Sequence, residues 1–177
     1  FYLHICKIFS TFVAQMSDII QYIITFLLYD NKAAANQVGY TADESKWNEY
    51  RVVILPNGHL GNQIVAPDLG EVQVEPLGKT EEDGKNRWII RTDIRYNTFF
   101  FISRSEELIN PERDEHGRFL AKYSILGKQN RLMIPTLDEY ARLLMKMLNL
   151  PLPTPSFNYI YLTHDVDSIA HYRHIRG

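Results

Sequence analysis

The chain has 177 residues, of which 45% are hydrophobic, and a formal net charge of −2 at pH 7. This length allows one ordinary domain, or one domain and part of another, with a sizeable core. The charge excludes a broad electrostatic attraction to nucleic acid or to an acidic membrane surface. The one cysteine, Cys6, excludes an internal disulfide and a cysteine-rich zinc site. It favours a reducing compartment, the cytoplasm, with cell-envelope association as the alternative.

The first expected element is an amphipathic helix. Ser17 is a suitable helix cap, and isoleucine and leucine recur at helical spacing after it, which predicts a helix over residues 18–29. The apolar segment 1–29 also raises the question of a membrane span. Polar residues interrupt it, however, and its longest clean run is far below the roughly 20 residues that a spanning helix needs. We therefore expect a buried helix and no membrane span.

Short elements are expected in the middle of the chain. Thr41 and Glu44 form a capping-box pattern, which predicts a short helix that ends at Tyr50. Apolar runs bounded by turn residues then indicate strands, and a longer aromatic run indicates a helix. These patterns predict strands at 51–55, 72–74 and 88–90, a helix at 95–108 and a charged loop at 110–118.

A regular helix ends the first part of the chain. Thr136 and Glu139 form a second capping box, and apolar residues follow at helical spacing, which predicts a helix over 136–149. Prolines then stand at every second position from Pro151 to Pro155, and this arrangement stops helices and sheets and stiffens the chain. We expect three parts: an amino-terminal α/β domain of layered sheet and flanking helices over 1–150, a proline linker over 151–156, and the start of a second domain over 157–177.

Two groups of residues before the linker have both a structural and a functional interpretation. The loop Glu112–Arg118 is a solvated turn in the simplest interpretation, but its mixed charges also suit a buried ion-pair network against the following domain. Catalysis by His116 is a lower-ranked alternative. The aromatic residues Tyr96, Phe99 and Phe100 suit either a buried core or a glycan-binding platform, and we favour the core.

The strongest chemical signal is a pair of acids near the end of the chain. Residues 157–162 predict a buried strand, and Asp165 and Asp167 follow it, next to His164. Residues two apart in an extended segment point the same way, so both carboxylates can face one pocket. Two such charges repel each other unless a cation lies between them, and a divalent metal ion is the natural partner. The structural alternative is that both acids cap the next helix.

These residues resemble a known family. The stretch Tyr161–Ser168, YLTHDVDS, resembles the first motif of the polysaccharide-deacetylase superfamily in its H-D-V-D form. The segment Asp93–Tyr140, with NPERDEHGRF and IPTLDEY, resembles a domain of unknown function that precedes the catalytic domain in a bacterial group of these proteins. The resemblance implies a (β/α) barrel, of which this chain contains the first strand. It also implies that Asp165 is the general base and that Asp167 binds the metal, often zinc.

The implied reaction is hydrolysis of the acetamide of an N-acetylated glycan or glycoconjugate by a metal-bound water. The sequence departs from the commoner motif, which has adjacent acids, because Val166 separates them here. The family's histidine ligands and its catalytic histidine come later than Gly177. His171 and His174 lack the context of those motifs, and we interpret them as solvated or partner-facing. The chain is therefore expected to be the amino-terminal part of a longer enzyme and to be inactive alone.

Two other functions are carried forward as alternatives. In the first, Asp165 is the phosphoryl-accepting nucleophile of a magnesium-dependent phosphatase, although Thr163 and His164 interrupt the apolar run that this pattern requires. In the second, the first 150 residues form a non-catalytic glycan-binding or scaffolding domain.

Overall fold

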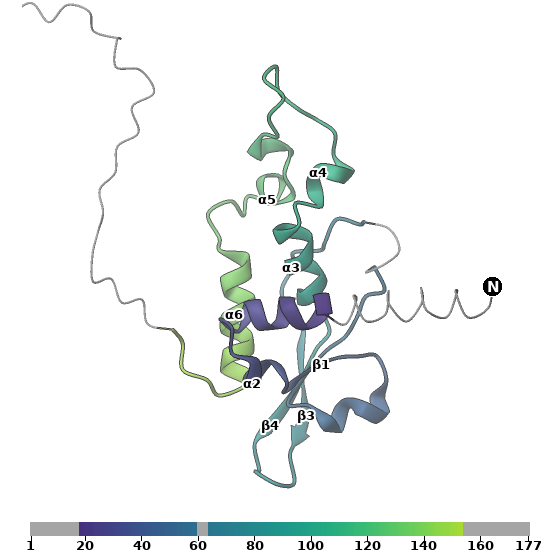
Figure 1. The fold of residues 1–177 in the computed structure, drawn as a ribbon, viewed down its shortest axis with the longest axis vertical. Helices are drawn as coiled ribbons and strands as arrows, with labels where there is room; N and C mark the ends of the chain where they lie inside the picture. Colours follow the sequence, from purple (N-terminus) through teal and green to yellow (C-terminus); the bar gives the residue numbers. More distant parts are fainter. Residues whose placement is uncertain (1–17, 60–63, 154–177) are drawn as a thin grey trace, which may run out of the picture.

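The computed structural model describes residues 18–59 and 64–153, which form a mixed α/β unit with a small sheet and flanking helices (Figure 1). The expected α/β class is therefore correct for this part of the chain. Cys6 and the residues expected to begin a barrel lie outside the described residues. Several predictions also concern residues that the structure does not describe. These residues are the expected strand at 157–162, the acids Asp165 and Asp167, and the histidines His164, His171 and His174.

A helix at residues 18–27 begins the described chain, and it shares the region beside the sheet with α3 and α6 (Figure 1). The short helices α4 and α5 lie at the far end of the molecule from the β3–β4 hairpin (Figure 1). After the first helix, the elements are α2 (Lys32–Ala35), β1 (Val38–Tyr40), the 3-10 helix η1 (Glu44–Glu49), β2 (Val52–Ile54), β3 (Val74–Lys79), β4 (Asn86–Ile90), α3 (Ile94–Ile102), α4 (Glu106–Ile109), the 3-10 helix η2 (Ala121–Tyr123), α5 (Ile125–Lys128) and α6 (Thr136–Met147).

The sheet has four strands in the order β1-β2-β4-β3. Strands β1, β2 and β4 are parallel, and β3 pairs antiparallel with β4. Tyr40, Ile54 and Ile90 lie in register at the carboxyl ends of the three parallel strands. The chain segments that leave these strands therefore start at one edge of the sheet, which we call the carboxyl edge.

The core lies between the sheet and the helices that cover it. All three residues of β2 are fully buried, as expected for a central parallel strand covered on both faces. Helix α6 contributes Leu144, and the first helix contributes the stripe that its spacing predicts. The residues of that stripe that are at most 2% exposed are Ile23, Ile24, Leu27 and Leu28.

The expected strands at 51–55 and 88–90 correspond to β2 and β4, but the expected strand at 72–74 begins only at Val74 and continues to Lys79. The missed strand is β1, which has only three residues. A side chain at its Gly39 would place a Cβ 2.4 Å from Cδ2 of Tyr50, so the strand depends on a glycine that is usually unfavourable in a strand. Local sequence therefore argues against β1, and packing of the Tyr50 ring favours it.

The single helix predicted over 95–108 is wrong. The structure has α3, then a break, then the single turn of α4. Ser103 Oγ donates a hydrogen bond to the Phe99 carbonyl, and Arg104 takes a positive φ of 54°. A non-glycine residue with this φ ends a right-handed helix, and nothing in the apolar spacing signals it.

Both predicted capping boxes are also wrong, although their helices exist. The cap of η1 is Asp43, whose carboxylate accepts the Ser45 N–H at 3.1 Å, and Thr41 lies outside this turn. Helix α6 begins after Pro135 without a side-chain cap, and the buried hydroxyl of Thr136 has no hydrogen-bond partner among the described residues. Pro135 occupies the cap position and Thr136 is the first helical residue, so the helix begins one residue too early for Thr136 to cap it.

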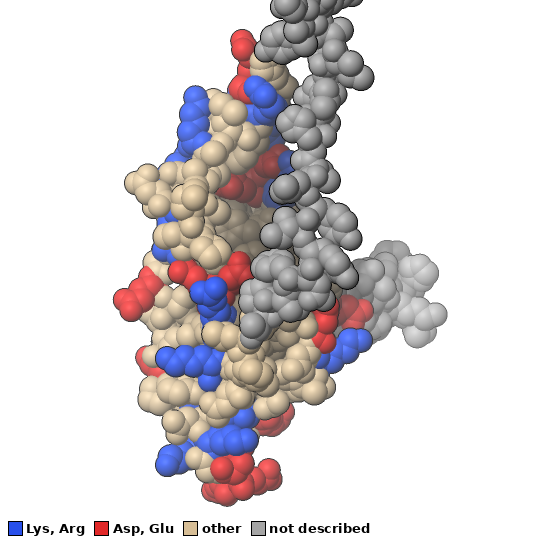
Figure 2. All heavy atoms as spheres, turned by 90° about the vertical axis from the view of Figure 1, so that its left-hand side faces the viewer, with Lys and Arg blue, Asp and Glu red and all other residues tan. Residues whose placement is uncertain are grey.

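Two surface properties complete the fold. On the face shown in Figure 2, basic and acidic side chains are interspersed, in keeping with the small net charge. No helix within the described residues is long and apolar enough to cross a membrane.

Candidate functional site

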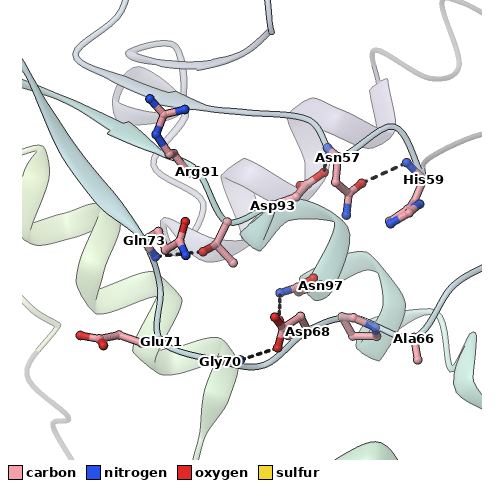
Figure 3. Close-up of a pocket in the computed structure, with 12 residues that line it drawn as sticks. Asn57, His59, Ala66, Asp68, Gly70, Glu71, Gln73, Arg91, Asp93 and Asn97 are labelled. Atoms are coloured by element: carbon pink, nitrogen blue, oxygen red, sulfur yellow. Dashed lines mark hydrogen bonds between the residues drawn. The ribbon is translucent and has the colours of Figure 1, made fainter.

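The described domain has a polar cavity of about 360 Å³ at the carboxyl edge of the sheet (Figure 3). Open α/β sheets bind their ligands in this position, outside the carboxyl ends of parallel strands. The walls come from the segments after β2 and β4, from the start of α3 and from the segment that leads into β3. The lining residues are Asn57, His59, Ala66, Pro67, Asp68, Gly70, Glu71, Gln73, Arg91, Thr92, Asp93 and Asn97.

Asp93 connects three of these segments. One carboxylate oxygen accepts the Tyr96 N–H at 2.8 Å and so caps α3. The other oxygen accepts the Tyr40 hydroxyl at 2.8 Å and the Asn57 N–H at 3.0 Å. Asp93 is only 4% exposed, so its carboxylate loses its hydrogen bonds to water on folding. The three protein hydrogen bonds compensate for that loss. The end of β1, the loop after β2 and the amino end of α3 are thereby held together.

A buried cation lies next to this carboxylate. The Arg95 guanidinium is 4.1 Å from the centroid of the Tyr40 ring, and the Arg95 side chain is fully buried. Burial lowers the pKa of Arg95, while the nearby Tyr40 and Asp93 act in the opposite direction. Burial and the negative charge of Asp93 raise the pKa of Tyr40 well above its ordinary value. Tyr40 is therefore a neutral hydrogen-bond donor at any physiological pH, and Arg95 provides the compensating positive charge.

The opposite wall of the cavity is the segment that returns to β3. The Tyr96 hydroxyl donates to the Val65 carbonyl at 2.7 Å and lies 2.8 Å from the Val65 amide nitrogen, which holds this segment against α3. Farther along, Asp68 Oδ1 accepts the Gly70 N–H at 3.0 Å and stabilises a tight turn. Figure 3 shows Asp68 and Gly70 across the cavity from Asp93.

Asn97 connects the two walls. Its side-chain amide donates to the Tyr140 hydroxyl at 3.1 Å and to the Asp68 carbonyl at 3.4 Å. Asn97 is only 3% exposed and lines the cavity. None of the described groups donates a hydrogen bond to its Oδ1, so this oxygen can accept one from a ligand in the cavity.

The charges around the cavity are unequal. Asp68, Glu71 and Asp93 contribute carboxylates, and the only guanidinium among the lining residues belongs to Arg91. Arg91 Nε lies 2.7 Å from a Glu75 carboxylate oxygen, so its charge is already paired. No cluster of three or more potential metal ligands occurs among the described residues. The described lining residues include no serine or cysteine.

The site residues proposed from sequence have mixed outcomes. Tyr96 and Phe100 are 2% and 0% exposed, so the preference for a core role over a glycan platform is confirmed for both; Phe99 is half-buried. His116 is largely exposed, and its Nε2 lies 3.4 Å from Glu115 in the charged loop.

The ion pairs of the charged loop, such as Arg118 with Asp114 at 2.9 Å, form at the surface. This agrees with the simpler interpretation, a solvated turn. The alternative, a buried network against a following domain, stays a prediction, because residues 154–177 lie outside the described residues.

Sequence reasoning missed the cavity. One signal was available: Asp93, Asn57 and the residues after them directly follow two predicted strands. In parallel strands such residues meet at one edge. The sequence did not reveal that β2 and β4 pair with each other in parallel, as the structure shows.

Comparison with known proteins identifies one family. The model of a family described as "Family of unknown function (DUF7033)" matches residues 4–153. No curated protein and no solved structure matches the chain.

Proposed function

We propose that this chain, which belongs to the DUF7033 family of unknown function, is the amino-terminal domain of a metal-dependent polysaccharide deacetylase. The whole enzyme would hydrolyse the acetamide of an N-acetylated glycan, releasing acetate and leaving a free amine on the sugar. The observation that carries the proposal is the stretch His164–Asp167, H-D-V-D, which follows the apolar run 157–162 after Thr163.

The two acids of this stretch have different roles in the proposal. Asp165 removes a proton from the attacking water, and Asp167 helps to hold the metal ion. The metal, expected to be zinc, would polarise the acetamide carbonyl and make the bound water nucleophilic. Both roles rest on the resemblance to the deacetylase motif.

Two observations support a separate amino-terminal domain in front of the motif. The core cluster extends to Leu144 and Leu148, near the end of α6 and before the prolines. The family match ends at residue 153, before the motif begins. Pro151 and Pro153 follow α6, and such a linker spans only about 3.1 Å per residue, so the second domain would start close to the first.

The test uses the full-length protein with zinc and an N-acetylglucosamine oligomer. We expect acetate release, and we expect Asp167→Asn to abolish both activity and stoichiometric zinc. Asp165→Asn should abolish activity while zinc remains bound, because it removes the base and leaves the ligand. Glu82→Gln, in the exposed β3–β4 hairpin, is the matched control and should behave as the unchanged protein. Zinc binding that survives Asp167→Asn would contradict the proposed roles.

The same assay separates the alternatives. Phosphate release from a phosphoester, with magnesium and without acetate release, would favour the phosphatase. A non-catalytic glycan-binding role has a specific observation in its favour, the polar cavity at the carboxyl edge. This role is compatible with a deacetylase, because a binding domain can hold the glycan near the catalytic one.

A further inference from the structure

We propose that the cavity at the carboxyl edge binds a de-N-acetylated amino sugar through its protonated amine and neighbouring hydroxyl groups. The choice of an amino sugar rests on the proposed function, because the free amine is the group that a deacetylase creates. The domain would thus hold the product end of a glycan and keep the enzyme on a partly deacetylated chain.

The size and position of the cavity suit one or two sugar units. Its volume of about 360 Å³ lies at the lower end of the range of about 300–1,000 Å³ that is usual for small-ligand sites. It opens at the carboxyl edge, where the walls are held in place by Asp93 and by the Tyr96–Val65 hydrogen bonds. A sugar would therefore enter a site whose shape exists before binding.

The cavity offers hydrogen-bond acceptors that have no protein donor. Asn97 is 3% exposed and lines the cavity, and its Oδ1 accepts no hydrogen bond from the described residues. Asp68 uses Oδ1 for the Gly70 N–H, and its Oδ2 accepts none of the hydrogen bonds found in the described part of the chain. An ammonium group has three N–H donors and no acceptor, and sugar hydroxyls can also donate, so both can satisfy these oxygens.

The charge of the cavity distinguishes an amine from an acetamide. Asp68 and Glu71 face solvent and have no basic partner in the described residues, whereas the Arg91 guanidinium is bound to Glu75. The amino end of α3 carries a partial positive charge that opposes a cation. Asp93 offsets this charge, because it accepts the Tyr96 N–H at that end. The remaining carboxylates therefore favour a protonated amine over a neutral acetamide or an acidic sugar.

The expected selectivity is modest. Ion pairs at partly exposed positions contribute up to about 1 kcal/mol, which corresponds to about a fivefold change in Kd. We expect a glucosamine tetramer to bind the 177-residue chain about fivefold more tightly than an N-acetylglucosamine tetramer at low salt. Because the difference is electrostatic, it should shrink as the ionic strength rises.

The experiment is isothermal titration calorimetry of the 177-residue chain with the two tetramers. Asp68→Asn keeps the acceptor for the Gly70 N–H and removes the charge, so it should reduce the preference to about twofold. Glu71→Gln is a second variant, in case the first one fails to fold, and Glu71 has no hydrogen bond to any described residue that the change would remove. Glu82→Gln removes an equal charge from the distant hairpin and should keep the full preference.

Several outcomes would overturn the inference. These are equal affinity for the two tetramers, an unchanged preference in both cavity variants, or equal loss of preference in Glu82→Gln. Competition by spermidine at the same concentration as the tetramer would also overturn it, because it would show general attraction of cations. The proposed function fails separately: a full-length protein without acetate release can still show the amine preference, and an active deacetylase can lack it.

Discussion

Removal of the Asp93 carboxylate tests whether this residue organises the carboxyl edge. Asp93→Ala deletes the acceptor of the Tyr96 N–H, the Asn57 N–H and the Tyr40 hydroxyl, all within 3.0 Å. It also leaves the fully buried Arg95 without its nearby negative charge. The variant therefore affects a helix cap, a loop, a strand end and a buried cation together.

The magnitude follows from the burial of these groups. Loss of a helix cap alone costs about 1 kcal/mol. A buried network that loses one charged partner costs about 3–5 kcal/mol, because the other groups remain buried without compensation. We expect the free energy of unfolding to fall by this larger amount for Asp93→Ala. Asp93→Asn keeps one neutral acceptor oxygen and should lose about 2 kcal/mol.

The assay is urea unfolding followed by circular dichroism. With a slope of about 2 kcal/mol per molar urea, the larger loss corresponds to a midpoint shift of about 1.5–2.5 M. Asp43→Ala is the matched control, since Asp43 caps η1 through the Ser45 N–H in the same way but at the surface. Its midpoint should move much less. Equal shifts in Asp93→Ala and Asp43→Ala would refute the argument that burial makes Asp93 important.

Three further predictions concern the core and the tyrosine next to Asp93. Gly39→Ala should destabilise the domain by about 1–3 kcal/mol in the same urea assay, because the new Cβ meets the Tyr50 ring; an unchanged midpoint would contradict this close approach. Leu144→Ala removes a fully buried α6 side chain and should cost about 2–5 kcal/mol, whereas Met133→Ala, at a position 94% exposed, should cost little. Because the pKa of Tyr40 is raised in the folded state, the folded protein keeps the Tyr40 hydroxyl proton above pH 10, where the unfolded chain loses it. The contribution of Tyr40 to the free energy of unfolding is therefore complete below pH 10 and declines as the pH rises above it. Tyr40→Phe should therefore make the loss of stability between pH 9 and about 11 shallower, and an equally steep loss would show that Tyr40 does not cause it.

Part of the fold was predictable because it depends on local periodicity. The apolar stripe of the first helix and the buried run of β2 were both identified from spacing alone. The break between α3 and α4 was not, because the apolar spacing continues across Arg104 while its backbone changes direction. Strand β1 was missed since three residues around a glycine carry almost no local signal.

The carboxyl-edge cavity shows the limit of sequence reasoning more directly. Its polar residues Asn57, Asp68, Asp93 and Asn97 come from segments separated by up to about forty positions, and only the parallel pairing of β2 with β4 brings them together. The sequence by itself determined the class of fold, the first helix, α6 and the resemblance of the terminal motif, because each depends on neighbouring residues. Only the tertiary structure decided which polar groups are buried, which are paired and which face one cavity, because burial and pairing depend on contacts between segments that are distant in the chain.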